Sequence, residues 1–423
     1  MQKAKGGIHR RDVLKGAVAG AAVTAVMGAP YVARAQANTI RIGMPTILSG
    51  RVAILGETSR DAVRLAISRI NDAGGIDGRQ LELIARDSRG QPDEAARVTR
   101  DLINSDGCEI IVDAEASSGA FAVHEVIREL PVLCIHTNSE TSALTADPEL
   151  HVPTAFRSAR QGIHDAVAGG KYAGNLAREK GLVRWMSCSP DYAYGRDNTA
   201  EFLEYLAIFE PSVEVVDQAW PKLFEPDYTA YVTRILQTAP DAMYSALWGG
   251  DLVSFIEQGN LYGLFGGDMT FFSVNLADPP IVKAISQVPD DLRSVYRYDP
   301  DYPDTEANRA FYDDFVAMSG GEPTNWSWEN FTAMQFIGEG LRRTGGKTDG
   351  EALAAEIRDM EIDSPFSDIG KITMRGSDHT IIHYPVAWGR SQSDPRGFTD
   401  WVPGDWGEIL EREAEWKVRK GYA

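Results

Sequence analysis

Two adjacent serines, Ser117 and Ser118, are the residues of this chain whose type and position suggest binding chemistry most directly. They follow residues 109–113, a run with three consecutive β-branched side chains that is typical of a strand buried on both faces of a parallel sheet. Apolar residues then recur at helical spacing from Phe121 to Leu130. A serine turn between a strand and a helix leaves free N–H groups and hydroxyls at the strand's carboxyl end, which suits an anion or a polar ligand. The competing interpretation, which this stretch alone favours, is that Ser118 only caps its helix.

The familiar catalytic and cofactor motifs are missing from the sequence. It contains no Gly-x-Ser-x-Gly elbow, no His-Glu-x-x-His pair and no Cys-x-x-Cys pair. Residues 345–348 resemble part of a phosphate-binding loop, but Leu341 stands where the first glycine of that motif belongs. Asp113 and Glu115 imitate a catalytic carboxylate pair, although near-adjacent acids at a strand end are commonly just solvated. We therefore predict that the protein is not an enzyme and uses no cofactor or metal.

Predicted strands and helices alternate along most of the chain. The pattern predicts strands at 39–47, 81–86, 109–113, 132–136, 184–189, 213–220, 242–247, 270–274, 292–298, 371–374 and 383–388. It predicts helices around 63–70 and at 92–105, 163–180, 196–209, 228–238, 252–262, 306–318, 328–343, 351–360 and 408–420. Alternation at this spacing indicates right-handed βαβ crossovers and parallel sheets. Two such series predict an α/β protein with two lobes.

The amino end has the pattern of an export signal. The pair Arg10-Arg11 precedes an apolar run rich in Ala and Gly at 16–32, and residues 33–35 offer an Ala-x-Ala cleavage site. This run is shorter than most membrane-spanning helices. We predict a twin-arginine signal peptide at 1–35, cleavage near Ala35 and a periplasmic location.

The charge balance restricts the partners. The 423-residue chain has 42 Lys and Arg against 61 Asp and Glu, and residues 1–35 hold six of the basic residues and one acidic residue. The remainder keeps 36 basic and 60 acidic residues, an excess of 24 negative charges that argues against nucleic acid and anionic membranes as partners. The three cysteines, Cys108, Cys134 and Cys188, are an odd set without close spacing. We expect buried free thiols, while a bridge between Cys108 and Cys134 stays an alternative.

Several phrases of the sequence together resemble one family. They are IRIGMPTILSG at 40–50, INDAGGIDGRQLELIARD at 70–87, ASSG at 116–119, DYAYGRD at 191–197 and LWGGD at 247–251. Over residues 39–390 the chain is similar to the leucine/isoleucine/valine-binding family of type I periplasmic binding proteins, which are exported ligand-binding components of ABC importers. The most specific part is the run 71–79, which marks the fold and not a binding site.

The resemblance implies an α/β fold of two doubly wound parallel-sheet lobes, joined by a hinge of three chain crossings, that close on a ligand between them. We expect the first lobe at 36–158 and 297–370, the second at 159–296 and 371–390, and a C-terminal tail at 391–423. The crossings are expected near 157–161, 296–298 and 369–372. The implied partners are a small-molecule ligand, either an amino acid or an organic acid, and the permease and ATPase of an ABC transporter. We expect the protein to be a monomer.

The resemblance also assigns ligand contacts by position. Ser118, with Ser117 beside it, matches a serine that holds the ligand carboxylate. Further contacts are expected from the turn after the next strand and from strand ends of the second lobe. These expected contacts are Asn138, Ser139, Glu140, Tyr194, Trp248, Asp251 and Asn275.

Two departures from the family's pattern leave the ligand class open. Amino-acid binders of the family usually place an acidic residue where Asn275 stands, to meet the ligand ammonium, and often an aromatic residue where Leu55 stands. Asp251 is an alternative source of that negative charge. The main expectation is a ligand like a branched-chain amino acid; the alternative is an aromatic or aliphatic acid or amide. A ligand-sensing protein is a further rival, but the chain offers no DNA-binding segment or membrane span for it.

Overall fold

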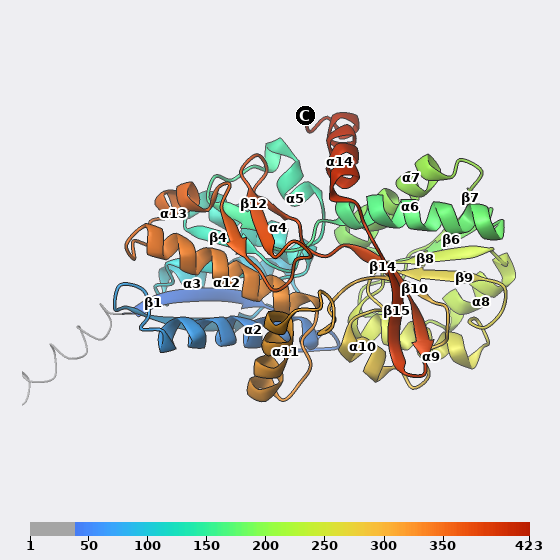
Figure 1. The fold of residues 1–423 in the computed structure, drawn as a ribbon, viewed down its shortest axis with the longest axis horizontal. Helices are drawn as coiled ribbons and strands as arrows, with labels where there is room; N and C mark the ends of the chain where they lie inside the picture. Colours follow the sequence, from blue (N-terminus) through green and yellow to red (C-terminus); the bar gives the residue numbers. More distant parts are fainter. Residues whose placement is uncertain (1–38) are drawn as a thin grey trace, which may run out of the picture.

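The computed structural model describes residues 39–423, so the predicted signal peptide lies outside the described residues. The described chain forms two α/β lobes that lie next to each other, with the C-terminal helix α14 (Trp406–Lys420) standing across their junction (Figure 1). Within residues 39–423, no helix is both long and apolar enough to cross a membrane. Cys108, Cys134 and Cys188 are buried free thiols, as expected.

The first lobe is built on an eight-stranded sheet with the order β11-β12-β13-β5-β4-β3-β1-β2. Its strands are β1 (Thr39–Thr46), β2 (Gln80–Asp87), β3 (Ile110–Asp113), β4 (Leu133–His136), β5 (Ala155–Arg157), β11 (Glu361–Asp363), β12 (Lys371–Arg375) and β13 (Thr380–Ile382). The strands from β2 to β13 pair in parallel, while β12 and β11 add antiparallel pairs at one edge. All residues of β3 and β4 are buried because helices cover both faces of the sheet.

The second lobe is built on a seven-stranded sheet with the order β15-β14-β10-β9-β8-β6-β7. Its strands are β6 (Arg184–Cys188), β7 (Glu214–Ala219), β8 (Ala242–Ser245), β9 (Thr270–Ser273), β10 (Arg293–Val295), β14 (Ala387–Ser393) and β15 (Arg396–Pro403). Strands β7 to β10 pair in parallel, and β14 and β15 form an antiparallel hairpin at the edge.

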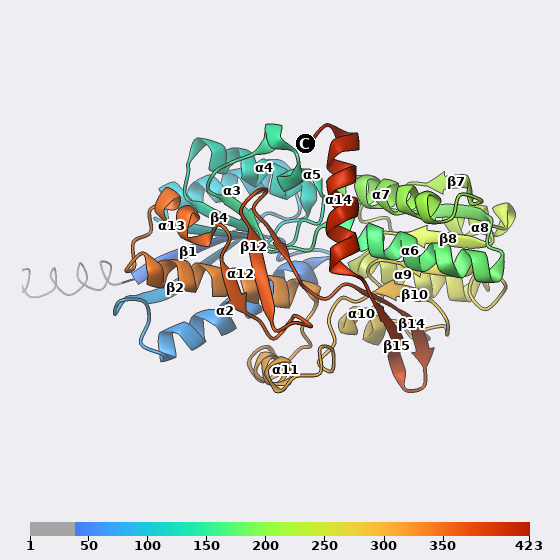
Figure 2. The ribbon, with the colours of Figure 1, turned by 45° about the horizontal axis from the view of Figure 1, so that its top comes forward.

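Helices cover both faces of each sheet (Figure 2). In the first lobe α2 packs against α12 on one face and α3 packs against α4 on the other; in the second lobe α6 and α7 lie on one face and α8, α9 and α10 on the other. The helices are α2 (Ala53–Asp72), α3 (Pro92–Asn104), α4 (Ser117–Glu129), α5 (Ala143–Ala146), the 3-10 helix η1 (Pro148–Leu150), α6 (Gly162–Lys180), α7 (Ala193–Phe209), α8 (Thr229–Thr238), α9 (Gly249–Leu261), α10 (Pro279–Ala284), α11 (Glu306–Ser319), α12 (Asn325–Arg343) and α13 (Gly350–Ile357).

The chain crosses between the two sheets three times, and the third crossing differs from our expectation. The first crossing lies between β5 and α6, and the second follows β10. We expected the third crossing at residues 369–372 and assigned residues 371–390 to the second lobe. The chain instead crosses between Ile382 and Ala387, because β12 and β13 pair with β11 and β5 in the first sheet. A short strand after a turn does not reveal from sequence which sheet it joins.

The expected C-terminal tail, residues 391–423, is also part of the folded body. β15 extends the second sheet, and α14 contacts both lobes. Glu413 of α14 is 1% exposed, forms an ion pair with Arg375 of β12 at 2.7 Å and is hydrogen-bonded to Nε2 of His164 in α6 at 3.2 Å. Lys417 of α14 adds an ion pair with Asp378 at 2.7 Å, beside β13. The helix therefore ties the two lobes together near the hinge.

We predict that Glu413→Gln lowers the free energy of unfolding at pH 7 by about 3 kcal/mol, because removing one partner leaves the charges of a buried ion-pair cluster unbalanced. Burial by itself would raise the pKa of Glu413, but the charges and hydrogen bonds of His164 and Arg375 outweigh it and hold the pKa well below its ordinary value. A carboxyl with a lowered pKa in the folded state stabilises above its unfolded pKa and loses this contribution as the pH falls.

Urea unfolding at pH 7 and pH 3 measures this difference. The loss should be smaller at pH 3. The control is Glu408→Gln, which breaks a more exposed pair between α14 and Lys171 at 2.6 Å and should cost less than about 1 kcal/mol. Equal losses in the two variants would show that Glu413 has no special role.

Candidate ligand-binding site between the lobes

A small cavity lies where the carboxyl ends of the parallel strands of both sheets face each other. About 280 Å³ of space there is not filled by protein atoms, open solvent included. Leu55, Ala116, Ser117, Asn138, Glu140 and Trp326 line it from the first lobe, Tyr192, Tyr194, Trp248 and Asn275 from the second, and Arg297 from the second crossing. Five of our nine expected contacts come from distant parts of the sequence and meet Ser117 here. They are Asn138, Glu140, Tyr194, Trp248 and Asn275.

The serine corner forms where β3 ends and α4 begins. Ala116 precedes the helix in an extended conformation, and no side chain of residues 39–423 caps the helix start. The first N–H groups of α4 are therefore available to an anion. Ser117 is 2% exposed, lines the cavity and accepts a hydrogen bond from the hydroxyl of Ser139 at 3.1 Å. A Cβ atom at Gly119 would lie 2.7 Å from a carboxylate oxygen of Glu115, so a larger residue there would displace that side chain.

Ser118, the serine favoured from the sequence, does not cap its helix, and its expected contact with a ligand stays a prediction. It is half-buried, it is not among the cavity-lining residues and it makes no capping hydrogen bond. Ser139 is buried behind Ser117 and supports it through their hydrogen bond. One turn of sequence cannot tell which of two adjacent serines faces a cavity, since that depends on where the helix begins.

The carboxylates Asp113 and Glu115 are buried beneath the corner, not solvated as we expected. Asp113 is 1% exposed and accepts a hydrogen bond from Nδ1 of His136 at 2.5 Å. Burial raises the pKa of Glu115 well above its ordinary value, and the nearby charge of Asp113 raises it further. The pair thus belongs to the support of the corner and does not line the cavity.

A buried ion pair between Glu140 and Arg297 forms one side of the cavity. Both guanidinium Nη atoms of Arg297 donate to the Glu140 carboxylate, Nη1 at 3.2 Å, and Asn325 donates to the same carboxylate at 3.4 Å. Glu140 is 4% exposed and Arg297 only 1%. Arg297 was missed by the sequence reasoning because it lies in a predicted strand, and only the fold brings it to Glu140, 157 positions away.

Aromatic side chains form the other side. Tyr194 accepts a hydrogen bond from Nδ2 of Asn275 at 2.9 Å, which fixes both side chains at the strand ends of the second lobe. The indoles of Trp248 and Trp326 meet edge to face with ring centroids 5.8 Å apart. Trp326 was also missed: it lies in the first turn of α12, whose start is fixed by a capping box between Thr324 and Ser327. These rings offer an apolar surface to a ligand.

Asp251 lies outside the cavity, at a contact between the lobes. Its carboxylate accepts a hydrogen bond from the backbone N–H of Phe224 at 2.7 Å and lies 3.6 Å from Nε of Arg51, a residue of the first lobe. Arg51 also donates to the hydroxyl of Ser254 in α9 at 2.7 Å. These contacts join the lobes on the side of the cavity opposite the hinge, so the structure is closed. Asp251 is thus not among the residues that line the cavity, and its expected ligand contact stays a prediction.

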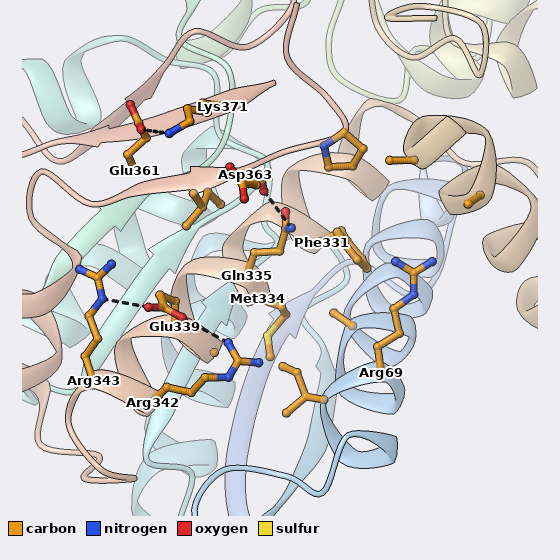
Figure 3. A pocket seen from close by; sticks show the side chains of 17 residues that line it. Arg69, Phe331, Met334, Gln335, Glu339, Arg342, Arg343, Glu361, Asp363 and Lys371 are labelled. Carbon is orange, nitrogen blue, oxygen red and sulfur yellow. Dashed lines mark hydrogen bonds and ion pairs between the residues drawn. The ribbon is translucent and has the colours of Figure 1, made fainter. Parts of the chain in front are cut away.

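A wider groove on the first lobe is separate from this site (Figure 3). It lies between α2, α12 and the edge strands β11 and β12. Its lysine and arginine side chains are engaged by nearby carboxylates, as in the pairs Arg343–Glu339 at 3.0 Å and Lys371–Glu361 at 2.5 Å. The groove touches neither the serine corner nor the second lobe.

Two α/β lobes that close on a small cavity define the class of solute-binding proteins. A family model described as Periplasmic binding protein matches residues 39–389, and this chain belongs to that family. The Leu/Ile/Val-binding protein homolog 4 of Brucella abortus (strain 2308) is 26% identical over 369 residues, which covers 82% of this chain and 83% of that protein. The predicted family and fold class are confirmed.

Solved structures show the same fold. A solute-binding protein of an ABC transporter from Rhodopseudomonas palustris BisB5, in complex with 3,4-dihydroxy benzoic acid, has a TM-score of 0.77 at 21% identity over 87% of this chain and 98% of that chain. An ABC transporter substrate-binding protein from Sphaerobacter thermophilus has a TM-score of 0.71 at 27% identity over 86% and 98%. These relatives are binding proteins of transporters. The family match ends before β15 and α14.

We predict that ligand affinity falls about two- to fivefold between pH 7.5 and pH 5, because Arg51 of the first lobe stabilises the ionised form of Asp251 only when the lobes are closed, and this contribution is lost when Asp251 is protonated. Burial raises the pKa of Asp251 to about 6, against the opposing hydrogen bond from Phe224. The carboxyl is therefore ionised at pH 7.5 and mostly protonated at pH 5.

Calorimetric titration at both pH values, on the wild type and on Asp251→Asn, checks this expectation. The variant should bind more weakly at pH 7.5 and should show a smaller change with pH. If Asp251→Asn changed the affinity for an amino acid but not for the matched acid without the amine, Asp251 would contact the ligand after all.

Proposed function

We propose that this protein is exported to the periplasm, captures a small carboxylate-bearing ligand between its two lobes and delivers it to the permease and ATPase of an ABC importer. The observation that carries the proposal is the closed cavity at the carboxyl edges of two parallel sheets, where ligands of open α/β sheets bind. The uncapped start of α4 supplies N–H donors for the carboxylate, and Ser117 adds a hydroxyl.

The ligand is small and has an apolar or aromatic body. The rings of Tyr192, Tyr194, Trp248 and Trp326 line the cavity and offer an apolar surface to such a ligand. Branched-chain amino acids are named for one relative and a dihydroxybenzoic acid for another. Both ligand classes bear a carboxylate, which is the part of the ligand that the serine corner fits.

Export by the twin-arginine route is part of this proposal and rests on residues 1–35. Replacing Arg10 and Arg11 by lysine should leave the precursor in the cytoplasm, because that pathway reads the arginine pair. Cell fractionation measures the location, and amino-terminal sequencing of the wild type should place the cut near Ala35. Unchanged export of the lysine variant would remove the twin-arginine part of the proposal.

The two adjacent serines supply a matched pair of variants for the binding site. Ser117→Ala should weaken ligand binding about ten- to a hundredfold, because a hydrogen bond to a charged group contributes roughly 1.5–3 kcal/mol. Ser118→Ala should change it less than about threefold, since its side chain does not line the cavity.

A thermal-shift screen of small amino acids and organic acids finds the ligand first, because binding to the folded state alone stabilises by about 4 kcal/mol at a ligand concentration a thousandfold above Kd. Calorimetry then compares the variants. If Ser118→Ala weakened binding more than Ser117→Ala, the corner would be oriented differently. Steady conversion of the bound ligand would refute the binding-only function.

A further inference from the structure

Two of the acceptor groups that line the cavity, the Glu140 carboxylate and the Asn138 amide oxygen, already accept hydrogen bonds from protein donors. The Glu140 carboxylate accepts from both Nη atoms of Arg297 and from Asn325. Oδ1 of Asn138 accepts from Nδ2 of Asn330 at 2.8 Å and from the hydroxyl of Thr137 at 3.1 Å. A ligand ammonium brings three N–H donors, and each of them needs an acceptor in a closed, dry site.

Donors, in contrast, are free. Nε of Arg297 is buried and has no hydrogen-bond partner within residues 39–423. Arg297 itself lines the cavity, and so does Ser117 in the uncapped first turn of α4. The cavity is thus lined by unpaired donors on two of its sides, which is the complement of a group with several acceptor oxygens.

The surrounding charges leave no carboxylate free for a cation in the cavity. Arg160 and Asp165 form a buried ion pair of their own behind Arg297. Glu329 accepts hydrogen bonds from the backbone N–H of Arg160 at 2.7 Å and from Nδ2 of Asn325 at 2.8 Å, and it does not line the cavity. Asp278 accepts from the backbone N–H of Asn325 at 2.8 Å and does not line the cavity.

We infer that Arg297 and Glu140 set the ligand class: the cavity selects a carboxylic acid that lacks an ammonium group, with Arg297 as the specificity-determining residue. This inference rests on the proposed function and narrows it. A carboxylate adds a partner to Nε of Arg297 and to the N–H groups of α4. An ammonium would compete with Arg297 for Glu140, and the buried guanidinium would keep only the more distant Asp165, whose carboxylate lies 4.0 Å from Nη1. Glu140 holds Arg297 in place and balances part of its charge.

The test compares ligands that differ only in the amine. Leucine and 4-methylpentanoate share one carbon skeleton, phenylalanine and 3-phenylpropanoate another, and 4-methylpentanamide is the uncharged control. For the wild type we expect the acids to bind at least about tenfold more tightly than the amino acids, since an unpaired buried charge is costly. Leucine that binds as tightly as 4-methylpentanoate would overturn the inference.

Two variants separate selectivity from folding. Glu140→Gln keeps the shape and an acceptor oxygen but frees the charge of Arg297, so 4-methylpentanoate should bind more tightly by about tenfold, while the amide should change little. The double variant Glu140→Gln/Arg297→Gln removes both charges together and so avoids a lone buried charge. Its preference for acids over amides should shrink to about threefold or less.

Different outcomes of these experiments would contradict the inference about Arg297 and the proposed binding function. If the acid preference survived in a folded double variant, as judged by its circular dichroism spectrum and melting curve, Arg297 would not be the specificity-determining residue. If Glu140→Gln strengthened the binding of leucine as much as that of 4-methylpentanoate, the freed charge of Arg297 would not be what selects the acid. If neither ligand series nor the wider screen stabilised the wild type, the proposed function itself would fail.

Discussion

The structure depends on pairing the charges that are buried at its hinge. Arg160 follows the first crossing, Arg297 lies on the second, and both are almost completely buried. An unpaired buried ion costs several kcal/mol even after relaxation. Asp165 of α6 supplies a negative charge to both arginines: it forms an ion pair with Arg160 and lies 4.0 Å from Nη1 of Arg297. Arg160 also donates to the carbonyl of Pro385 on the third crossing at 2.8 Å.

This network places the binding chemistry where the lobes pivot. Arg297 is held by Glu140 of the first lobe, and its Asp165 neighbour belongs to the second lobe, so the guanidinium lies between the two parts that move in a hinged protein. On the opposite side of the cavity, Arg51 joins the lobes through Ser254 and Asp251. A ligand between these two sets of contacts touches both lobes and the hinge at once.

The C-terminal segment adds a second connection outside the matched family span. β15 completes the second sheet, and α14 runs from one lobe to the other with Glu413 at its centre. Tyr205 of α7 donates to the carbonyl of Arg412 at 2.6 Å, so the helix is also held by a neutral hydrogen bond on the second lobe. The lobes are thus joined by three crossings and by one helix that packs over them (Figure 2).

The sequence by itself determined the elements and the fold class. Strands and helices could be predicted because their patterns lie within short stretches of sequence. Examples are the buried run of β3 and the helical spacing of apolar residues in α2 and α6. Periodicity also placed the serine corner, whereas the strand-end contacts were expected from the resemblance to the family. It missed short strands such as β5 and β13, whose three residues carry little pattern and gain stability from their neighbours in a sheet.

Only the tertiary structure decided which of these side chains face the ligand cavity. Ser117 lines it and Ser118 does not, because the start of α4 sets the direction of each side chain. Asp251 points to Arg51 and Phe224 because the lobes close against it, and Arg297 reaches Glu140 because two distant strand ends meet at the hinge. These contacts join residues that are far apart in sequence. They form because a buried charge without a partner is costly, and local sequence patterns do not indicate which distant residue will be that partner.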